Sequence, residues 1–139
     1  MFVLDTNVVS ELMRPVPRPA VEAWVGGCPA TSLFFTAVGE SELWFGVEIM
    51  PRGVRRDALA TAIEHVLRED FASRILPFDS RAARHYATIA ATRRAAGRPI
   101  SQADCQIAAI AGSRGSTIVT RNVRDFEGLG IALVNPWER

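Results

Sequence analysis

The feature that most limits what this chain can fold into is a regular alternation of short apolar segments with amphipathic helical segments. Helical patterns span residues 8–13, 20–25, 37–49, 57–69, 81–96 and 101–111. The apolar, β-prone segments between them are residues 2–4, 33–35, 75–78, 117–120 and 131–134. Strands that alternate with helices in this way form parallel sheets with helices on both faces. We therefore predict an α/β fold, a three-layer α/β/α sandwich around a central, mainly parallel sheet.

Helix-capping residues support two of these helices. Asp79 and Ser80 form a good N-cap pair before the helix at 81–96, and Gly97 follows its last residue, where glycine is favoured. Ser101 and Asp104 have the spacing of a capping-box variant, which predicts that the next helix begins there.

The length and composition exclude several classes of protein. A chain of 139 residues corresponds to one domain, residues 1–139, and no apolar run reaches the roughly 18–20 residues of a membrane span. The first residues lack the basic and long apolar regions of a secretory signal. The two cysteines are widely spaced, so a zinc site is not indicated. We expect a cytoplasmic protein that contacts no membrane.

Acidic and amide side chains follow the predicted strands. Asp5 comes directly after the first strand, and Asn122 and Asp125 follow the strand at 117–120. Glu42 lies in the helix after the second strand, and Asp104 lies in the first turn of its helix. Ligands of open parallel sheets bind where the strands end, so these groups can converge on one edge. Oxygen ligands of this kind suit Mg²⁺, and a pair of such ions can activate water at a phosphodiester.

Polar residues near the acids also fit a metal site. Each acid, however, also fits an ordinary structural role. The polar side chains that can orient the acids or a substrate are Thr6, Asn7, Thr120 and Asn122. Taken alone, Asp104 suits a helix N-terminus, Asp5 and Asp125 suit turns, and Glu42 suits a solvated helix face. Spacing alone leaves both interpretations open.

Short stretches of the chain resemble the ordered motifs of the PIN-domain family: VLDTN at 3–7, ELWFG at 42–46, DCQIAA at 104–109 and TRNVRDF at 120–126. The tail, with GLGI at 128–131 and NPW at 135–137, resembles that of the VapC-like toxins, including the FitB-like members. The likeness covers nearly the whole chain. It implies the PIN fold and a Mg²⁺- or Mn²⁺-dependent endoribonuclease, the toxin of a type II toxin–antitoxin pair.

The resemblance also implies site residues. It assigns metal binding and catalysis to Asp5, Glu42 and Asp104, which would hold a metal that activates water. The family's fourth acid falls at Asn122, and this departure leaves two alternatives: Asp125 supplies the fourth carboxylate, or three acids suffice. Asn122 also favours a catalytically silent PIN interaction module. A housekeeping PIN ribonuclease in RNA maturation is a further alternative, and a phosphoacceptor domain is disfavoured because the chain has no lysine.

The basic side chains are unevenly distributed. Residues 1–50 contain 2 arginines and 6 acids and residues 51–139 contain 14 arginines and 9 acids, so the net charge of +1 is a cancellation. Arg121 and Arg124 flank the fourth motif and are candidates to bind substrate, together with Thr6, Asn7 and Thr120 near the acids. Two further clusters are either solvated helix faces or additional phosphate contacts: Arg52, Arg55 and Arg56, and Arg93, Arg94 and Arg98.

The resemblance finally implies partners. Similar toxins dimerise and are silenced by a small antitoxin, so we expect a VapB-like antitoxin, an RNA substrate, and either a homodimer or a toxin–antitoxin hetero-oligomer. Contact with DNA is expected only through the antitoxin. Trp44 and Phe45 beside Glu42 are either core residues or part of an apolar groove for an antitoxin helix.

Overall fold

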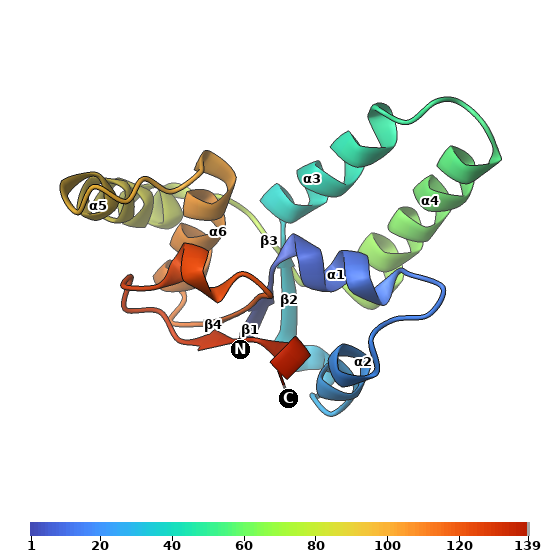
Figure 1. Cartoon of the computed structure of the whole chain (residues 1–139), viewed down its shortest axis with the longest axis horizontal. Helices are drawn as coiled ribbons and strands as arrows, with labels where there is room; N and C mark the ends of the chain where they lie inside the picture. Colours follow the sequence, from blue (N-terminus) through green and yellow to red (C-terminus); the bar gives the residue numbers. More distant parts are fainter. Residues whose placement is uncertain (139) are drawn as a thin grey trace.

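The computed structural model describes residues 1–138 and has a five-stranded sheet at its centre (Figure 1). The strands run in the order β3-β2-β1-β4-β5 and are β1 (Phe2–Leu4), β2 (Leu33–Thr36), β3 (Ile75–Leu76), β4 (Thr117–Val119) and β5 (Leu133–Val134). All neighbouring strands are parallel, and Phe2 lies opposite Leu33 on one side and Thr117 on the other. The residue that follows β1 therefore lies in the middle of the carboxyl edge of the sheet.

Two edge strands are shorter than the sequence predicts. β3 ends at Leu76 because β2 ends opposite it at Thr36, so Pro77 and Phe78 have no strand to pair with. β5 consists only of Leu133 and Val134, the two residues that lie opposite β4. The first two residues of the predicted segment 131–134 are therefore not part of the strand.

The helices alternate with the strands as predicted, with some shifted ends. They are α1 (Thr6–Leu12), α2 (Pro19–Gly26), α3 (Ala37–Glu48), α4 (Val54–His65), α5 (Ser80–Ala95) and α6 (Gln102–Ser113), with short turns η1 (Ala30–Ser32), η2 (Val66–Asp70), η3 (Val123–Phe126) and η4 (Pro136–Glu138). The first helix begins at Thr6 rather than at residue 8 because the Asp5 side chain caps it. The helix predicted at 57–69 begins earlier, at Val54, and continues after His65 as a π-helical turn.

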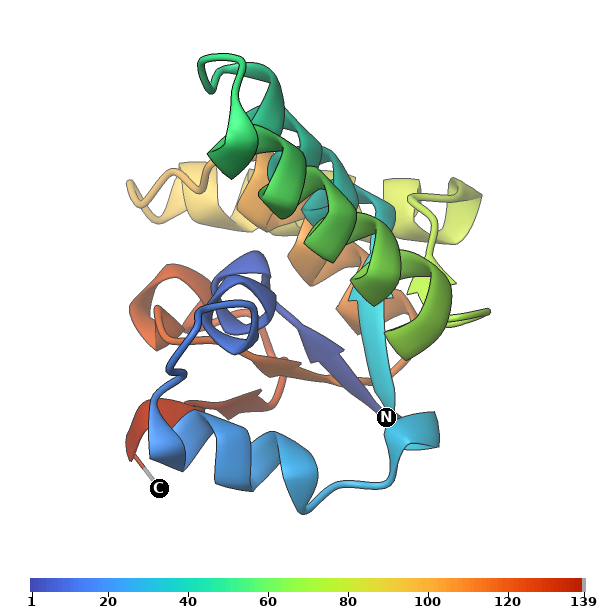
Figure 2. The same cartoon turned by 90° about the vertical axis from the view of Figure 1, so that its right-hand side faces the viewer.

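Two apolar cores lie on opposite faces of the sheet. Alternate strand residues point to opposite faces, so Val3 packs in the core under α5 and α6, whereas Leu4 packs in the core under α1 to α4. Figure 1 shows α5 and α6 on one side of the sheet and α3 and α4 on the other, and in Figure 2 α3 and α4 lie side by side. The predicted α/β/α sandwich is therefore confirmed.

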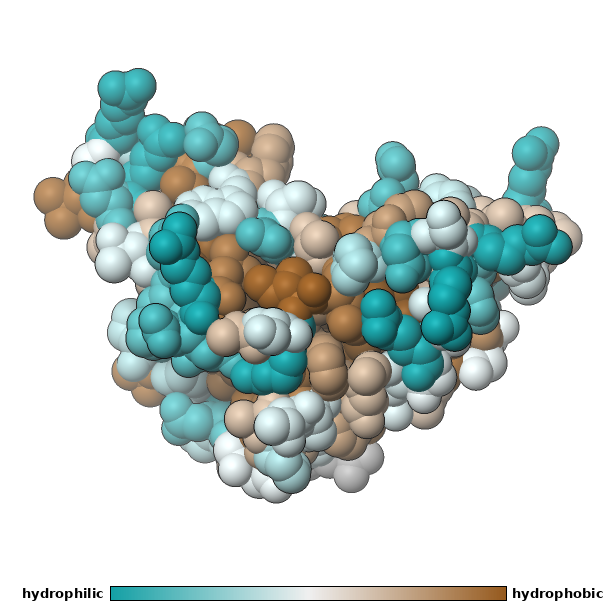
Figure 3. All heavy atoms as spheres, turned by 180° about the vertical axis from the view of Figure 1, so that it is seen from behind, coloured by the Kyte–Doolittle hydropathy of each residue, from teal (hydrophilic) through white to brown (hydrophobic). Residues whose placement is uncertain are grey.

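Apolar side chains also reach the surface. Trp44 packs against the core, but Phe45 and Ile49, one turn apart on α3, are 66% and 67% exposed. Seen from behind, apolar surface gathers in the hollow between two raised lobes (Figure 3). Within residues 1–138, none of the helices has the length and apolar character needed to cross a bilayer.

Glycines of α3 provide a test of the packing. A Cβ at Gly39 would lie 2.4 Å from Cε1 of Phe35, a ring with no exposed surface, whereas a Cβ at Gly46 would meet nothing within 4 Å. We expect Gly39→Ala to destabilise the protein by about 1–3 kcal/mol through overpacking. Gly46→Ala should instead stabilise it by about 0.5–1 kcal/mol, because alanine favours the helix. Urea unfolding measures both, and a Gly39→Ala variant as stable as the wild type would contradict this packing.

Candidate active site

Asp5 lies at the centre of the carboxyl edge of the sheet and is only 6% exposed. Its backbone N–H donates to the carbonyl of Val119 at 2.9 Å, which fixes it beside the end of β4. Its Oδ1 accepts from the N–H of Thr6 at 2.8 Å, and this bond caps α1. Its Oδ2 accepts from the hydroxyl of Thr120 at 2.8 Å. Oδ2 also accepts from Nδ2 of Asn7 at 3.3 Å, whereas Oδ1, with its single donor, keeps a free lone pair.

Thr120 organises a small polar network around Asp5. It has no exposed surface, and its Oγ1 accepts from the N–H of Asn122 at 3.0 Å and from Nδ2 of Asn7 at 3.4 Å. Oδ1 of Asn7 in turn accepts from the N–H of Arg121 at 3.4 Å. Asn7 and Thr120, which the sequence suggested as substrate contacts, thus hold the end of β4 and the Asp5 carboxylate in place.

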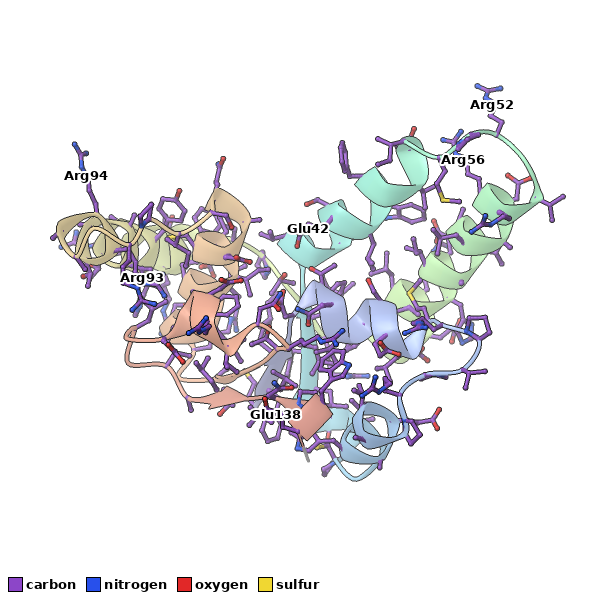
Figure 4. All side chains as sticks on the ribbon, viewed as in Figure 1. Glu42, Arg52, Arg56, Arg93, Arg94 and Glu138 are labelled. Carbon is purple, nitrogen blue, oxygen red and sulfur yellow. The ribbon has the colours of Figure 1, made fainter. Side chains whose placement is uncertain are left out.

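Glu42 reaches the site from the second turn of α3. That helix begins at Thr36, whose Oγ1 accepts from the N–H of Gly39 at 2.9 Å. The Glu42 side chain is exposed, and its Oε1 accepts from the hydroxyl of Thr6 at 2.6 Å. Figure 4 shows Glu42 on the side of α3 that faces α6. Thr6 therefore links the acid of α3 to the helix that Asp5 caps.

Asp104 comes from the first turn of α6 and is half-buried. Its N–H donates to Oγ of Ser101 at 3.2 Å, so the predicted cap of this helix is confirmed and fixes the turn that carries the carboxylate. Burial raises the pKa of Asp104, and the negative charges of Asp125 and Glu42 add to the shift.

The Asp5 carboxyl is the most perturbed of these acids. Burial raises its pKa to about 6, against hydrogen bonds from Thr120 and Thr6 that lower it. The charges of Asp104 and Glu42 raise it further. Because Glu42 raises the pKa values of both Asp5 and Asp104, and Asp104 raises that of Asp5, the structure brings the three predicted acids into one electrostatic cluster.

The predicted fourth group lies in the η3 turn. Asn122 is exposed and precedes the turn, while Asp125, Asp104 and Arg124 line the same cavity of about 480 Å³. Asp125 acts on the pKa of Asp104, and Asn122 contributes its backbone N–H to Thr120. Asp125, rather than Asn122, is therefore the residue of this turn that adds a negative charge near Asp104.

The candidate arginines separate into different environments. The guanidinium of Arg121 lies 5.3 Å from the ring centre of Trp137, and the Arg121 carbonyl accepts from Nδ2 of Asn135 at 3.4 Å. Arg121 is thus held on the C-terminal segment. In the other clusters Arg56 pairs with Glu48 at 3.1 Å, whereas Arg52 and Arg94 point into solvent (Figure 4).

Two features of the site are absent from the sequence interpretation. The ring of Trp137 packs against the guanidinium of Arg121. In the sequence, Trp137 stood out only as part of the NPW segment that resembles the tail of VapC-like toxins. Arg93 is buried, and its Nη2 donates to the carbonyls of Asp125 and Glu127 at 2.8 and 2.9 Å. The helical spacing from Ile89 to Arg93 could have placed Arg93 on the buried face of α5, but no pattern reveals its main-chain acceptors far along the chain.

The donor set fits a hard divalent cation that keeps other oxygen ligands. Across residues 1–138 no three His, Cys, Asp or Glu side chains are close enough to enclose a metal ion by themselves. Carboxylates that raise one another's pKa values are nevertheless stabilised by a cation between them. Mg²⁺ needs only one or two carboxylates, since water and substrate phosphate complete its shell. Asp5 and Asp104, with Glu42 beside them, meet that requirement.

Comparisons with known proteins agree with this geometry. The family model described as PIN domain matches residues 2–130. VapC ribonuclease Y4jK of Sinorhizobium fredii is 41% identical over 138 residues, and toxin FitB of Neisseria gonorrhoeae is 36% identical over 137, each alignment covering 99% of both chains.

Solved structures show the same fold over the whole length. The crystal structure of FitAcB from Neisseria gonorrhoeae has a TM-score of 0.92 at 36% identity and covers 100% of both chains. The structure of FitAB bound to an IR36 DNA fragment has a TM-score of 0.91 at 36% identity and covers 99% of this chain and 96% of that one. The chain therefore belongs to the PIN-domain family, in the branch that contains VapC ribonucleases and the FitB toxin.

Proposed function

We propose that this chain is the toxin of a type II toxin–antitoxin pair and acts as a Mg²⁺- or Mn²⁺-dependent endoribonuclease. The proposal rests on the cluster of Asp5, Glu42 and Asp104 at the carboxyl edge of the sheet, in a chain 41% identical to a VapC ribonuclease. A silent interaction module would have no need of a cluster in which Glu42 raises the pKa values of Asp5 and Asp104, since like charges this close cost stability without a cation.

The acids have different roles in this proposal. Asp5 and Asp104 hold the metal, because Asp5 is buried, Asp104 is half-buried, and both are fixed at helix N-termini. Glu42 is exposed, and with one oxygen engaged by Thr6 it completes or orients the shell. When bound, the metal lowers the pKa of a coordinated water and offsets the charge that grows on the phosphate. The Thr120 hydroxyl keeps Asp5 ionised and oriented, since it donates to Oδ2.

Asp125 is proposed as the source of the fourth negative charge. It lines the cavity that contains Asp104 and contributes to the raised pKa of that acid. Asn122 offers a neutral amide at the mouth of the turn, so it orients ligands rather than adding charge. In this proposal the fourth acid lies at Asp125 and no longer at position 122, so the site keeps its negative charge although Asn122 departs from the family pattern.

RNA is proposed to approach over the same cavity. Arg98 and Arg124 line it, are exposed, and make no ion pair within residues 1–138. Free guanidinium groups at an acidic metal site suit the phosphates on either side of the cleaved bond. Thr6 remains a candidate substrate contact, and so does Arg121, whose guanidinium is held against the ring of Trp137.

The partners follow from the relatives. FitB is found in the FitAB assembly bound to DNA. By analogy this chain binds a VapB-like antitoxin, forms a homodimer or a toxin–antitoxin hetero-oligomer, and meets DNA through the antitoxin only. Its substrate places its action in the cytoplasm.

Cleavage of RNA by the purified chain tests the chemistry. With Mn²⁺ and a mixed RNA panel, we expect cleavage that EDTA abolishes. Asp5→Asn and Asp104→Asn should lose at least about 100-fold in rate, because each removes a charged ligand, and Glu42→Gln and Asp125→Asn about 10-fold. Glu40→Gln, on the same helix as Glu42, is the matched control and should retain full activity. Cleavage that persists in EDTA or in Asp5→Asn would exclude the metal mechanism.

Expression in a bacterial host tests the toxin assignment. We expect induction of the wild-type chain to arrest growth and co-expression of the adjacent reading frame to restore it. The Asp5→Asn variant should be harmless at equal protein level, because it lacks the ligand that cleavage needs. RNA cleavage in vitro without growth arrest would instead indicate a housekeeping ribonuclease.

The stability of the metal-free chain should change with pH through Asp5. Its folded pKa of about 6 exceeds the ordinary value of 3.8, so the folded state retains a proton that the unfolded state releases, and stability falls as pH rises from 4 to 6. About 2 pKa units correspond to about 3 kcal/mol, and Asp5→Asn loses about 1 kcal/mol from the Thr120 hydrogen bond. In EDTA the variant should therefore be about 2 kcal/mol more stable than wild type at pH 7.5 and about 0.5 kcal/mol less stable at pH 4, as urea unfolding would show. A difference of the same sign at both pH values would contradict the assignment.

A further inference from the structure

Arg93 is a charged side chain in the interior of the protein. It lies in the last turn of α5 and is 6% exposed. The next residue, Arg94, is exposed, and Figure 4 shows the two side chains pointing in opposite directions, Arg94 into solvent and Arg93 toward the chain that follows β4. Among residues 1–138 Arg93 has no carboxylate within ion-pair distance. Its charge therefore serves something other than a salt bridge.

The partners of Arg93 are the main-chain carbonyls at the end of the η3 turn. Nη2 donates to the carbonyl of Asp125 at 2.8 Å and to that of Glu127 at 2.9 Å, 32 and 34 residues away along the chain. Between these two acceptors lies Phe126, which is 1% exposed and packs in the core under α5 and α6. One guanidinium thus anchors the turn on both sides of its buried residue.

The turn held in this way carries groups of the acidic site. Arg93, Asp104 and Asp125 line one cavity of about 480 Å³, with Arg124 at its edge. At the ends of the turn, the Asp125 N–H donates to the Asn122 carbonyl at 3.0 Å and the Glu127 N–H donates to the Arg124 carbonyl at 3.5 Å. The two bonds of Arg93 add a tie from the end of this turn to α5, so they help to hold Asp125 relative to Asp104.

Burial of a guanidinium has a large desolvation cost, and an apolar side chain would fill the same space without it. Charge-assisted hydrogen bonds to fixed carbonyls offset that cost only where the acceptors are well placed, so the arrangement also restricts the acceptors. A direct contact of Arg93 with RNA, which the sequence left open, is disfavoured because the side chain is buried and already bonded.

We propose that Arg93 is a positioning residue for the carboxylate site, because its guanidinium fixes the η3 turn so that Asp125 faces Asp104 across their shared cavity. The inference rests on the proposed metal-dependent function, since the consequence of a displaced Asp125 is weaker binding of a divalent cation. Residues that orient a metal site in this way typically change metal affinity or activity by about 10–100-fold when they are replaced.

The test compares Arg93→Met, Arg93→Lys and the matched control Arg94→Met in the full chain. Calorimetry with Mn²⁺ alone should give a Kd about 10-fold or more weaker for Arg93→Met and unchanged for Arg94→Met. Arg93→Lys should recover part of the affinity, because an ammonium donates to a carbonyl but lacks the planar fork. In amide hydrogen exchange, residues 122–127 should exchange faster in Arg93→Met while α6 is unchanged. RNA cleavage should lose kcat by a similar factor, with KM changed less than about twofold.

Several outcomes would overturn the proposal. Wild-type Mn²⁺ affinity in Arg93→Met, or unchanged exchange at residues 122–127, would show that Arg93 does not hold the site. A loss of affinity matched by faster exchange throughout the chain would show a general structural role. If Arg93→Met does not fold, Arg93→Lys alone decides, since it must then show the local exchange and reduced Mn²⁺ affinity. A wild-type chain that binds no Mn²⁺ and cleaves no RNA refutes the proposed function instead, and the exchange measurement still tests the hold on the turn.

Discussion

The site depends on one buried carboxylate. Asp5 follows the central strand, is almost excluded from water, and has hydrogen-bond donors on both oxygens, from the Thr6 amide and the Thr120 hydroxyl. These bonds favour its charged form, but burial outweighs them and keeps its pKa near 6. At neutral pH this acid is mostly ionised, and its buried negative charge costs stability unless positive charge arrives from outside the chain. The packing of β1 between β2 and β4 therefore creates a need for a cation at the carboxyl edge.

The other acids are arranged around this fixed point by different parts of the fold. Glu42 comes from α3 and Asp104 from α6, helices on opposite faces of the sheet, and Asp125 comes from the η3 turn. The carboxyl edge of a parallel sheet, where ligands of such folds bind, brings residues from both layers and from the loops after the strands together. The site is thus a product of the topology, and a change in either layer alters its geometry.

Local patterns in the sequence were enough to predict the layers and a group of acids at the strand ends, and the resemblance to the PIN-domain family selected Asp5, Glu42 and Asp104 among them. Alternating apolar segments determine the sheet, and a polar residue directly after a buried strand must lie at its edge, as Asp5 does. The contacts that the sequence could not predict join residues distant along the chain through main-chain atoms. Arg93 meets the carbonyls of Asp125 and Glu127, and carbonyls have no signature in the sequence. For the same reason the shorter β3 and β5 depend on where their partner strands end.

The arginines show why the net charge of the chain says little about its chemistry. Arg93 is inside the protein, Arg121 lies on Trp137, Arg56 pairs with Glu48, and Arg124 is exposed beside Asp104 and Asp125. Only the last of these environments leaves a guanidinium free next to the acids, where a phosphate could bridge arginine and metal. The excess of arginine in residues 51–139 is therefore divided among a buried position, an aromatic contact, an ion pair and an exposed position beside the acids. Arg124 and Asp125 belong to the same η3 turn, so they move together. A contact that anchors this turn therefore positions a guanidinium and a carboxylate at once.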